Sequence, residues 1–276
     1  MILPNFLIIG CFKCGTTSLW RSLRAHPDIF MPSSKELYYF SDDTIYKRGL
    51  DWYANHFKRG GACPAVGEAT DRYTCTEKAP ERISRVLPEA KLLYIVRNPI
   101  KQIESHYLHL KSAGKELCEF NDAVLNNPDY IKIADYKKWV DLYNDFYMRR
   151  NIKIIFLEDL IDQPINVIND TLSFLNLKPL NEEKLKVEDL HKNKSADKFE
   201  DRSLTYFLRK NIPLAKKIDH QLNGKIRYFL KYLLRRKIDS RPSWNSSTKD
   251  YVLSALRGNI QAFLKETGKP ADFWKS

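Results

Sequence analysis

The most informative stretch of the chain is FLIIGCFKCGTTSL, residues 6–19. A short apolar run ends at Gly10, and a loop then leads to small and hydroxyl-bearing residues. This order is typical of a strand that passes through a loop into a helix, where the first N–H groups and hydroxyls bind a phosphate. The sequence therefore predicts an anion-binding loop at Gly15, Thr16, Thr17 and Ser18.

The lysine of this loop does not stand where nucleoside triphosphatases place theirs. In those enzymes the G-x-x-x-x-G pattern is followed at once by lysine. Here Gly15 is followed by Thr16, and the lysine is Lys13, inside the loop. Lys13 is then expected to reach a group attached beyond the bound phosphate. The alternative is an ordinary strand-to-helix turn with an incidental lysine.

A second anion site is predicted in KLLYIVRNPIKQIESHY, residues 91–107. Arg97 stands at the carboxyl end of a strand, where open α/β sheets bind their ligands. Asn98 and Pro99 suit the start of a helix, and Ser105 lies about two turns into it. A strand-end arginine can equally be an ordinary ion-pair partner. If both anion sites are real, the ligand carries phosphate at two places.

The composition favours a globular protein with an anionic partner. The chain has 276 residues, 43% of them hydrophobic, and a formal net charge of +12. Its five cysteines are irregularly spaced, and the C-x-x-C of Cys11 and Cys14 has no matching second pair, so neither a disulfide framework nor a metal is expected. We predict a cytoplasmic location, since we find no leader peptide and no apolar run near the roughly 20 residues that span a bilayer.

Four apolar runs predict the strands of a parallel sheet, because three of them are rich in branched residues that do not alternate with polar ones. These runs cover residues 6–10, 64–68, 91–96 and 152–157. Helical patterns lie between them, over residues 16–25, 77–87, 99–112 and 135–150. The alternation predicts an α/β protein with a P-loop-like three-layer fold, in which helices flank a central parallel sheet.

The remainder of the chain is expected to be a long polar loop followed by helices. Residues 203–236 have helical spacing and many basic side chains. A last helix is predicted to begin with Ser247 or Thr248 as N-cap, to end at Gly268 and to pack on the sheet. We predict one domain over residues 1–276, with an α/β core up to about residue 178 and a helical C-terminal part.

At these motifs the chain resembles the sulfotransferases that use 3′-phosphoadenosine 5′-phosphosulfate (PAPS), most closely the heparan-sulfate and bacterial carbohydrate-type branch. FLIIGCFKCGTTSL resembles their 5′-phosphosulfate loop, and RNPIKQIESHY their 3′-phosphate motif. HPDIFMPSSKELYYF resembles the segment with the catalytic glutamate, VGEATDRY a further cleft segment, and FLKETGKPADFW the ending of bacterial members. The resemblance implies PAPS as sulfuryl donor and 3′-phosphoadenosine 5′-phosphate (PAP) as product, with no metal required.

The resemblance also implies roles for individual residues. Glu36 matches the catalytic base, Lys13 a stabiliser of the leaving group, and His109 a cleft histidine of some members. The 5′-phosphate would be bound by Gly15, Thr16, Thr17 and Ser18, and the 3′-phosphate by Arg97 and Ser105. The segment HKNKS has two interpretations. In one, the 3′-phosphate or adenine would be reached by His191, Asn193, Lys194 and Ser195, and in the other the segment is a solvated loop.

The acceptor side is less well matched. Lys35 and Glu68 are expected to line it, but Ala69 stands where heparan-type members often carry a lysine. The heparan substrate is therefore not carried over. A hydroxyl or amine of a carbohydrate or glycolipid is the expected acceptor, and a lipid alcohol, another small metabolite or a peptide tyrosine remains an alternative.

Two other functions stay open. A phosphate-loop kinase would use acids at a strand end, here Glu158 and Asp159, to hold Mg²⁺. A binding module would place KIRYFLKYLLRRK, residues 225–237, on a membrane surface or nucleic acid. Against the first, Lys13 is misplaced, and Arg97 and Ser105 would have no task. Against the second, the apolar positions fit more simply a helix docked on the core. We expect in-line sulfuryl transfer, no nucleic-acid partner and at most peripheral membrane contact.

Overall fold

The computed structural model describes residues 1–180, 199–201, 235–237 and 242–274. They form two compact units, one of residues 1–102, 132–180 and 254–274, the other of residues 103–131 and 242–253 with two short strands. The helices predicted over 203–234, and with them Lys194 and Ser195, lie outside the described residues. A single domain over 1–276 stays a prediction.

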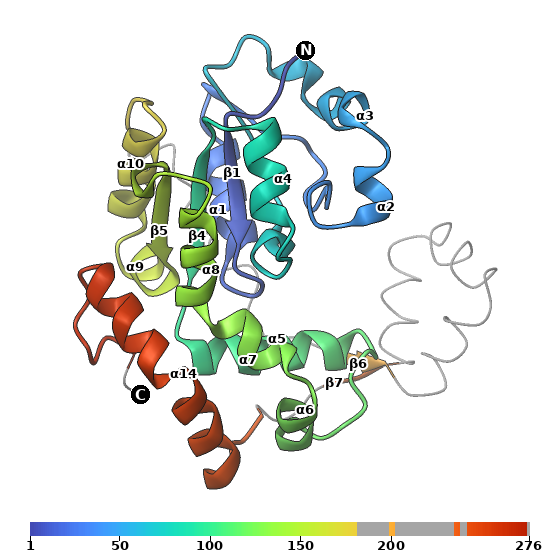
Figure 1. The fold of residues 1–276 in the computed structure, drawn as a ribbon, viewed down its shortest axis with the longest axis vertical. Helices are drawn as coiled ribbons and strands as arrows, with labels where there is room; N and C mark the ends of the chain where they lie inside the picture. Colours follow the sequence, from blue (N-terminus) through green and yellow to red (C-terminus); the bar gives the residue numbers. More distant parts are fainter. Residues whose placement is uncertain (181–198, 202–234, 238–241, 275–276) are drawn as a thin grey trace, which may run out of the picture. The chain divides into compact units, whose positions relative to one another are not determined.

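The first unit is built on a five-stranded parallel sheet (Figure 1). Its strands are β1 (Phe6–Gly10), β2 (Ile29–Phe30), β3 (Ala65–Ala69), β4 (Lys91–Val96) and β5 (Ile152–Phe156). Their order is β2-β3-β1-β4-β5, and each neighbouring pair is parallel. The carboxyl ends of all strands therefore meet at one edge of the sheet.

The helices of the described ranges are divided between the two units. They are α1 (Thr16–Arg24), α2 (Asp43–Tyr46), α3 (Leu50–Ala54), α4 (Ala79–Val86), α5 (Pro99–Ser112), α6 (Phe120–Asn126), α7 (Asp129–Ala134), α8 (Tyr136–Asn144), α9 (Leu157–Asp162), α10 (Pro164–Phe174) and α14 (Ser246–Glu266). Single 3-10 turns occur at η1 (Asn55–Gly60), η2 (Asp71–Thr74) and η3 (Arg149–Asn151). Within these ranges no helix has the length and apolar character to cross a bilayer.

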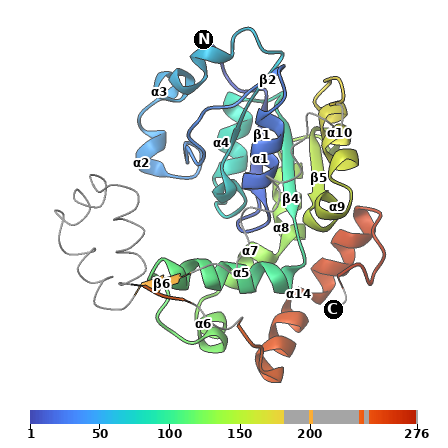
Figure 2. The same ribbon diagram turned by 180° about the vertical axis from the view of Figure 1, so that it is seen from behind.

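Helices cover both faces of the sheet, which confirms the predicted three-layer fold. Figure 1 shows α4 and α8 in front of the sheet, and Figure 2 shows α1 on the opposite side. The first face carries Leu7, Ile9, Leu92, Tyr94 and Val96. The second face carries Phe6, Ile8, Leu93 and Ile95. Successive residues of each strand thus enter different apolar layers, which explains why the strands show no polar alternation.

Most predicted elements are present, with shifted ends. The helix over 99–112 is confirmed, and the strand predicted over 64–68 lies one residue later. The helix predicted over 135–150 is too long, because it ends at Asn144 and the chain is extended by Met148. Strand β2 was missed, since two residues make too short a pattern to recognise.

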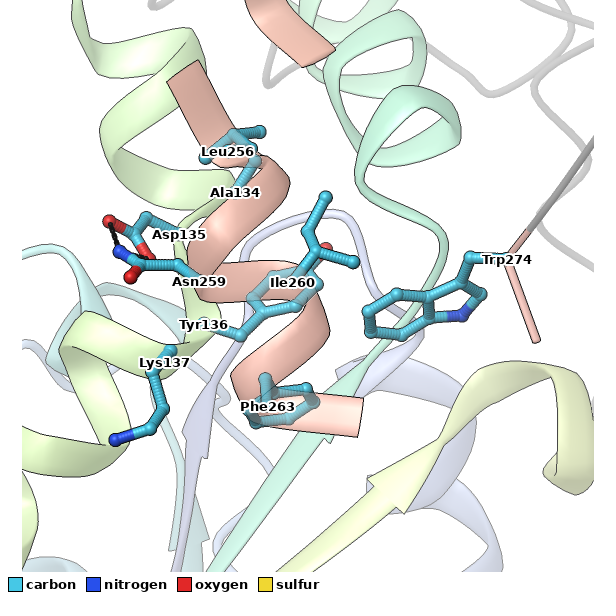
Figure 3. Close-up of a pocket in the computed structure, with 9 residues that line it drawn as sticks. All are labelled: Ala134, Asp135, Tyr136, Lys137, Leu256, Asn259, Ile260, Phe263 and Trp274. Carbon is cyan, nitrogen blue, oxygen red and sulfur yellow. Dashed lines mark hydrogen bonds between the residues drawn. The ribbon is translucent and has the colours of Figure 1, made fainter. Parts of the chain in front are cut away.

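The C-terminal helix docks on the first unit as predicted. Figure 3 shows the small pocket where α8, α14 and Trp274 meet. The Asn259 amide donates to both carboxylate oxygens of Asp135, at 2.9 and 2.8 Å. The rings of Phe263 and Trp274 stack 6.0 Å apart with an 11° angle between their planes. This polar clamp and ring stack fix the end of the chain beside the sheet.

The ends of this helix differ in how well they were predicted. Gly268 has a φ of 71° and follows the last turn, as expected of a C-terminal glycine. The predicted N-caps, Ser247 and Thr248, are wrong, because the helix already begins at Ser246. Asn245 caps it instead, and its side-chain oxygen accepts the backbone N–H of Thr248 at 2.7 Å.

The second unit has a small aromatic contact of its own. The Trp244 indole N–H donates to Glu104 at 3.0 Å, and its ring lies edge-on to Phe120 at 4.7 Å. Strands β6 (Phe199–Asp201) and β7 (Arg235–Lys237) form an antiparallel pair. The last two residues of the segment predicted as a helix over 203–236 are therefore in a strand.

A carboxyl group is buried inside the first unit. Glu68, at the end of β3, is 1% exposed. One of its oxygens accepts the hydroxyls of Tyr53 at 2.9 Å and Tyr73 at 2.6 Å, and the other accepts the Thr70 hydroxyl at 2.8 Å. Burial raises the pKa of Glu68 to about 7, against the three hydroxyl bonds that lower it. This cluster ties β3 to α3 and to η2.

The surroundings of two glycines, one in β3 and one on α14, predict opposite effects when each is replaced by alanine. A Cβ at Gly67 would come within 2.2 Å of the Phe6 ring, so Gly67→Ala should lower the free energy of unfolding by roughly 1–3 kcal/mol. Gly258, exposed on α14, has nothing within 4 Å of such an atom, so Gly258→Ala should raise it by about 0.5–1 kcal/mol. Urea unfolding measures both, and equal shifts would contradict the packing.

The Glu68 cluster predicts a pH-dependent stability. Between pH 4.5, the ordinary pKa of a glutamate, and about pH 7, folded Glu68 holds a proton that the unfolded chain has lost. Its contribution to the free energy of unfolding should fall as pH rises through that window, by roughly 1 kcal/mol per pH unit. Glu68→Gln removes this titration, so the difference between wild type and variant should change across the window and level off above it. A difference that does not depend on pH would contradict the prediction.

Candidate active site

The predicted site residues of the first unit lie where β3, β1 and β4 end side by side. The chain leaves β1 through α1 on one face of the sheet, and it returns from β4 through α8 on the other. Neighbouring strands whose connections leave to opposite faces open a crevice at their carboxyl ends, which is where α/β proteins bind ligands.

The loop after β1 has the features of an anion site. Gly15 has a φ of 96° and precedes α1, which has no acidic residue in its first turn. The first N–H groups of a helix have no acceptor within it, and the helix dipole favours a negative charge there. Thr16 and Ser18 are 4% and 8% exposed and line the start of the helix. Lys13 has a φ of 65°, a conformation that is uncommon for a side-chain-bearing residue and that clusters at functional sites.

The two cysteines of this loop anchor it. Cys11 and Cys14 are fully buried. The Cys11 thiol lies 3.5 Å from the carbonyl oxygen of Ile133, and the Cys14 thiol 3.6 Å from the hydroxyl of Tyr136. Burial raises the pKa of Cys11, whereas a redox cysteine needs an accessible thiol of low pKa. The C-x-x-C therefore joins the loop to the α7–α8 segment.

Arg97 lies beside this loop. Its Nη1 donates to the carbonyl oxygen of Lys13 at 3.4 Å, and its buried Nε has no hydrogen-bond partner among the described residues. Asn98 caps α5, as expected, because its side-chain oxygen accepts the N–H of Lys101 at 3.2 Å. The guanidinium thus brings a second cation, with an unused donor, to the edge of the anion loop.

Two predicted partners of Arg97 belong to the second unit. Ser105 is 5% exposed on α5, and His109 lies one turn further along the same helix. Their roles toward the donor and the acceptor stay predictions.

Glu36 is fixed at three points. Its backbone N–H donates to the carbonyl oxygen of Ala69 at 2.9 Å. Its Oε2 accepts the backbone N–H of Asp71 at 3.0 Å, and its Oε1 pairs with the ammonium of Lys35. Like Lys13, it has a left-handed backbone, with a φ of 64°. The matched catalytic base is therefore held rigidly beside the end of β3.

Aromatic packing positions this segment. Tyr39 and Phe40 are buried, and the Tyr39 ring stacks on Tyr53 at 4.4 Å with 13° between the planes. Phe40 lies edge-on to Tyr73 at 5.6 Å. The rings of Tyr39 and Phe40 thus anchor the chain in the core, and the charged residues before them stay partly exposed.

Lys35 joins the base to the anion loop. Its ammonium donates to the hydroxyl oxygen of Thr16 at 3.0 Å while it pairs with Glu36. The sequence predicted Lys35 on the acceptor side, and the structure places it against the loop that would hold the donor. Glu68, also predicted there, is buried and accepts the hydroxyls of Tyr53, Tyr73 and Thr70.

Asp71 is the site residue that sequence reasoning missed. Its backbone N–H donates to Glu36, and burial followed by the charge of Glu36 raises the pKa of its half-buried carboxyl to about 7. Burial, helped by the same two acids, raises the pKa of Tyr38 to about 12. The segment EATDRY was recognised, but nothing in the sequence marks its aspartate as a neighbour of a glutamate 35 residues earlier.

The acids that a kinase would need are engaged elsewhere. Glu158 accepts the backbone N–H of Asn98 at 2.7 Å, and Asp159 forms an ion pair with Lys269 at 2.7 Å. Both serve to hold β4, β5 and the end of the chain together. A Mg²⁺-dependent phosphoryl transfer site is therefore not favoured.

Comparison with known proteins gives the family of the chain. The family description of the sulfotransferase domain matches residues 3–240. The membrane-associated sulfotransferase kil1 of Dictyostelium discoideum is 37% identical over 110 residues, 39% of this chain and 23% of that protein. Human heparan sulfate glucosamine 3-O-sulfotransferase 6 is 28% identical over 183 residues, 63% of this chain and 53% of that protein. The chain thus spans about half or less of the length of these relatives.

Solved structures agree at the level of the fold. A sulfotransferase from Alicyclobacillus acidocaldarius superposes with a TM-score of 0.70 at 21% identity, and each chain is covered completely. The sulfotransferase domain of the curacin biosynthetic pathway gives a TM-score of 0.55 at 15% identity, covering 93% of this chain and 99% of that domain. Since the sulfotransferase domain matches well over half of the sequence, the chain belongs to the sulfotransferase family.

Proposed function

We propose that this protein transfers a sulfuryl group from PAPS to a hydroxyl or amine of a carbohydrate or glycolipid. The observation that supports this most is the position of Arg97 beside the anion loop, with Nη1 on the Lys13 carbonyl and Nε unpaired within the described part of the chain. Two anion-binding groups at adjacent strand ends suit a nucleotide phosphorylated at both its 5′ and its 3′ position.

The donor would be bound by the loop and by the strand-end arginine. Gly15, Thr16, Thr17 and Ser18 would hold the 5′-phosphate through N–H groups and hydroxyls. Arg97 would bind the 3′-phosphate together with Ser105. Lys194 and Ser195 would reach the 3′-phosphate or the adenine. This leaves Lys13 to neutralise charge on the oxygen between phosphorus and sulfur.

Transfer would follow an in-line course. The acceptor oxygen attacks sulfur, the bond from sulfur to the phosphate oxygen breaks, and PAP leaves with the electron pair. Glu36 takes the proton of the attacking hydroxyl, and Lys13 stabilises the leaving oxygen. His109 would orient the acceptor. A sulfuryl group carries less negative charge than a phosphoryl group, so we expect no metal ion to be needed.

The acceptor class rests on the relatives. Those named above include enzymes whose names specify heparan sulfate glucosamine, and the net charge of +12 favours an anionic acceptor. Ala69 departs from the heparan-type pattern, so another glycan or a glycolipid is the proposed acceptor. Peripheral membrane contact through residues 225–237, and a cytoplasmic location, stay predictions.

Recognition of the 3′-phosphate can be tested by calorimetric titration without metal. PAP should bind at least about 10-fold more tightly than AMP, because a hydrogen bond between charged groups contributes roughly 1.5–3 kcal/mol. Arg97→Ala should weaken PAP binding by about 10- to 100-fold and leave AMP binding unchanged. Arg85→Ala, which removes an exposed arginine on α4, is the matched control. Equal affinity for PAP and AMP, or tighter binding of ATP with Mg²⁺, would refute the proposal.

The role of Glu36 can be tested by transfer of ³⁵S from labelled PAPS to a panel of glycans and glycolipids. Glu36→Gln should lower kcat by about 10²- to 10⁴-fold, the usual contribution of a general base, without loss of PAP binding. Lys13→Ala should lower kcat by about 10²- to 10³-fold. Glu81→Gln, an exposed change on α4, should have no effect. A Glu36→Gln enzyme with wild-type kcat would show that another group takes the proton.

A further inference from the structure

Lys35 contacts both halves of the proposed site with one ammonium group. Its Nζ donates to the Thr16 hydroxyl at 3.0 Å and forms the ion pair with Glu36 Oε1. The side chains of Lys35 and Glu36 are 14% and 21% exposed, so water screens the pair only in part. The hydroxyl expected to meet the 5′-phosphate and the carboxylate expected to take the acceptor's proton therefore share one cation.

Glu36 is held in place, but neither of its oxygens is unoccupied in this arrangement. The Asp71 N–H binds Oε2 at 3.0 Å, and Lys35 binds Oε1. The Lys35 ammonium thus occupies the oxygen to which an acceptor hydroxyl would have to donate. Departure of Lys35 would free Oε1 to accept a proton, while the backbone contacts to Ala69 and Asp71 kept the carboxylate oriented.

A phosphate at Thr16 would compete with Glu36 for this cation. The lysine head is a compact charge on a flexible stem, and its Nζ already lies within hydrogen-bond distance of the Thr16 hydroxyl. A phosphate bound to that hydroxyl and to the first N–H groups of α1 brings several anionic oxygens to the same place. These oxygens would attract the ammonium at short range, where the attraction between opposite charges is strongest. The ammonium would therefore move from the carboxylate, which carries one negative charge, toward the phosphate.

We propose that Lys35 couples donor binding to the base: in the free enzyme it is paired with Glu36, and the donor's 5′-phosphate draws it away and releases Glu36 Oε1. The inference rests on the proposed function, since it needs a phosphate in the loop and a base at Glu36. It makes the base available only after the donor is bound. Lys35 is thus a donor-side residue, in place of the acceptor-side role predicted from the sequence.

A double-mutant cycle on PAP affinity tests this without an acceptor or turnover. Calorimetry would give the PAP dissociation constants of wild type, Lys35→Met, Glu36→Gln and the double variant. Loss of Lys35 should weaken PAP binding by about 10-fold or more, because a charged contact is removed. Glu36→Gln should tighten it by roughly 3- to 10-fold in the wild-type background and have no effect in the Lys35→Met background, the mark of two coupled residues.

The other outcomes of the double-mutant cycle lead to different conclusions. An equal gain from Glu36→Gln in both backgrounds would show direct repulsion between the carboxylate and the phosphate, and it would overturn the coupling. No gain in the wild-type background would overturn it as well. A wild-type protein that binds PAP no better than AMP would instead refute the proposed function.

Two further variants protect the cycle from effects on folding. Lys78→Met removes an exposed lysine that pairs with Asp43, and it should leave PAP affinity and the melting temperature unchanged. If Lys35→Met lowers the melting temperature, the cycle is run with Lys35→Arg, which keeps the cation. In that background the gain from Glu36→Gln should persist, and its absence would contradict the coupling.

Discussion

The parallel pairing of β1 with both β3 and β4 is the constraint on which the site depends. Ile8 lies opposite Ala69, whose carbonyl oxygen accepts the N–H of Glu36, and Gly10 lies opposite Tyr94, close to the end of β4, after which Arg97 follows. A slip of one residue would turn Glu68 out of its hydroxyl cluster and move the Ala69 carbonyl away from Glu36. Register, which the apolar packing of both faces fixes, therefore sets the geometry of the anion loop, the base and the arginine together.

Three carboxyl groups, those of Glu36, Glu68 and Asp71, lie close together at the end of β3 in that geometry. Burial raises the pKa of Glu68 and of Asp71 to about 7, and the charge of Glu36 contributes to both shifts. Glu36 is the member of this group that forms an ion pair with Lys35, and its side chain is partly exposed. The contacts of Glu36 with Lys35 and with the Asp71 N–H support it as the proposed base, with Glu68 and Asp71 shaping its surroundings.

The sequence predicted what local patterns encode, and it missed what depends on contacts between distant segments. Apolar runs revealed four of the five strands, and glycine with hydroxyl residues revealed the anion loop. Glu36 was found through its resemblance to a family motif. Asp71 and the bond from Lys35 to Thr16 were missed, because both arise only when the end of β3 and the segment before Tyr39 meet at the loop. The buried C-x-x-C shows the converse, since a pattern suggestive of chemistry serves here to anchor the loop.

The departure from the triphosphatase loop follows from the same contacts. The position that carries lysine in those enzymes is Thr16, and the cation found at it is Lys35, which comes from the segment that holds the proposed base. A lysine within the helix could bind phosphate, but it would have no connection to a base elsewhere in the chain. Because the ammonium of Lys35 lies between Thr16 and Glu36, it can be drawn from the carboxylate toward a phosphate bound at the loop. Because Thr16 stands where those enzymes carry lysine, the ammonium of Lys35 can serve first one role and then the other, donor binding and control of the proposed base.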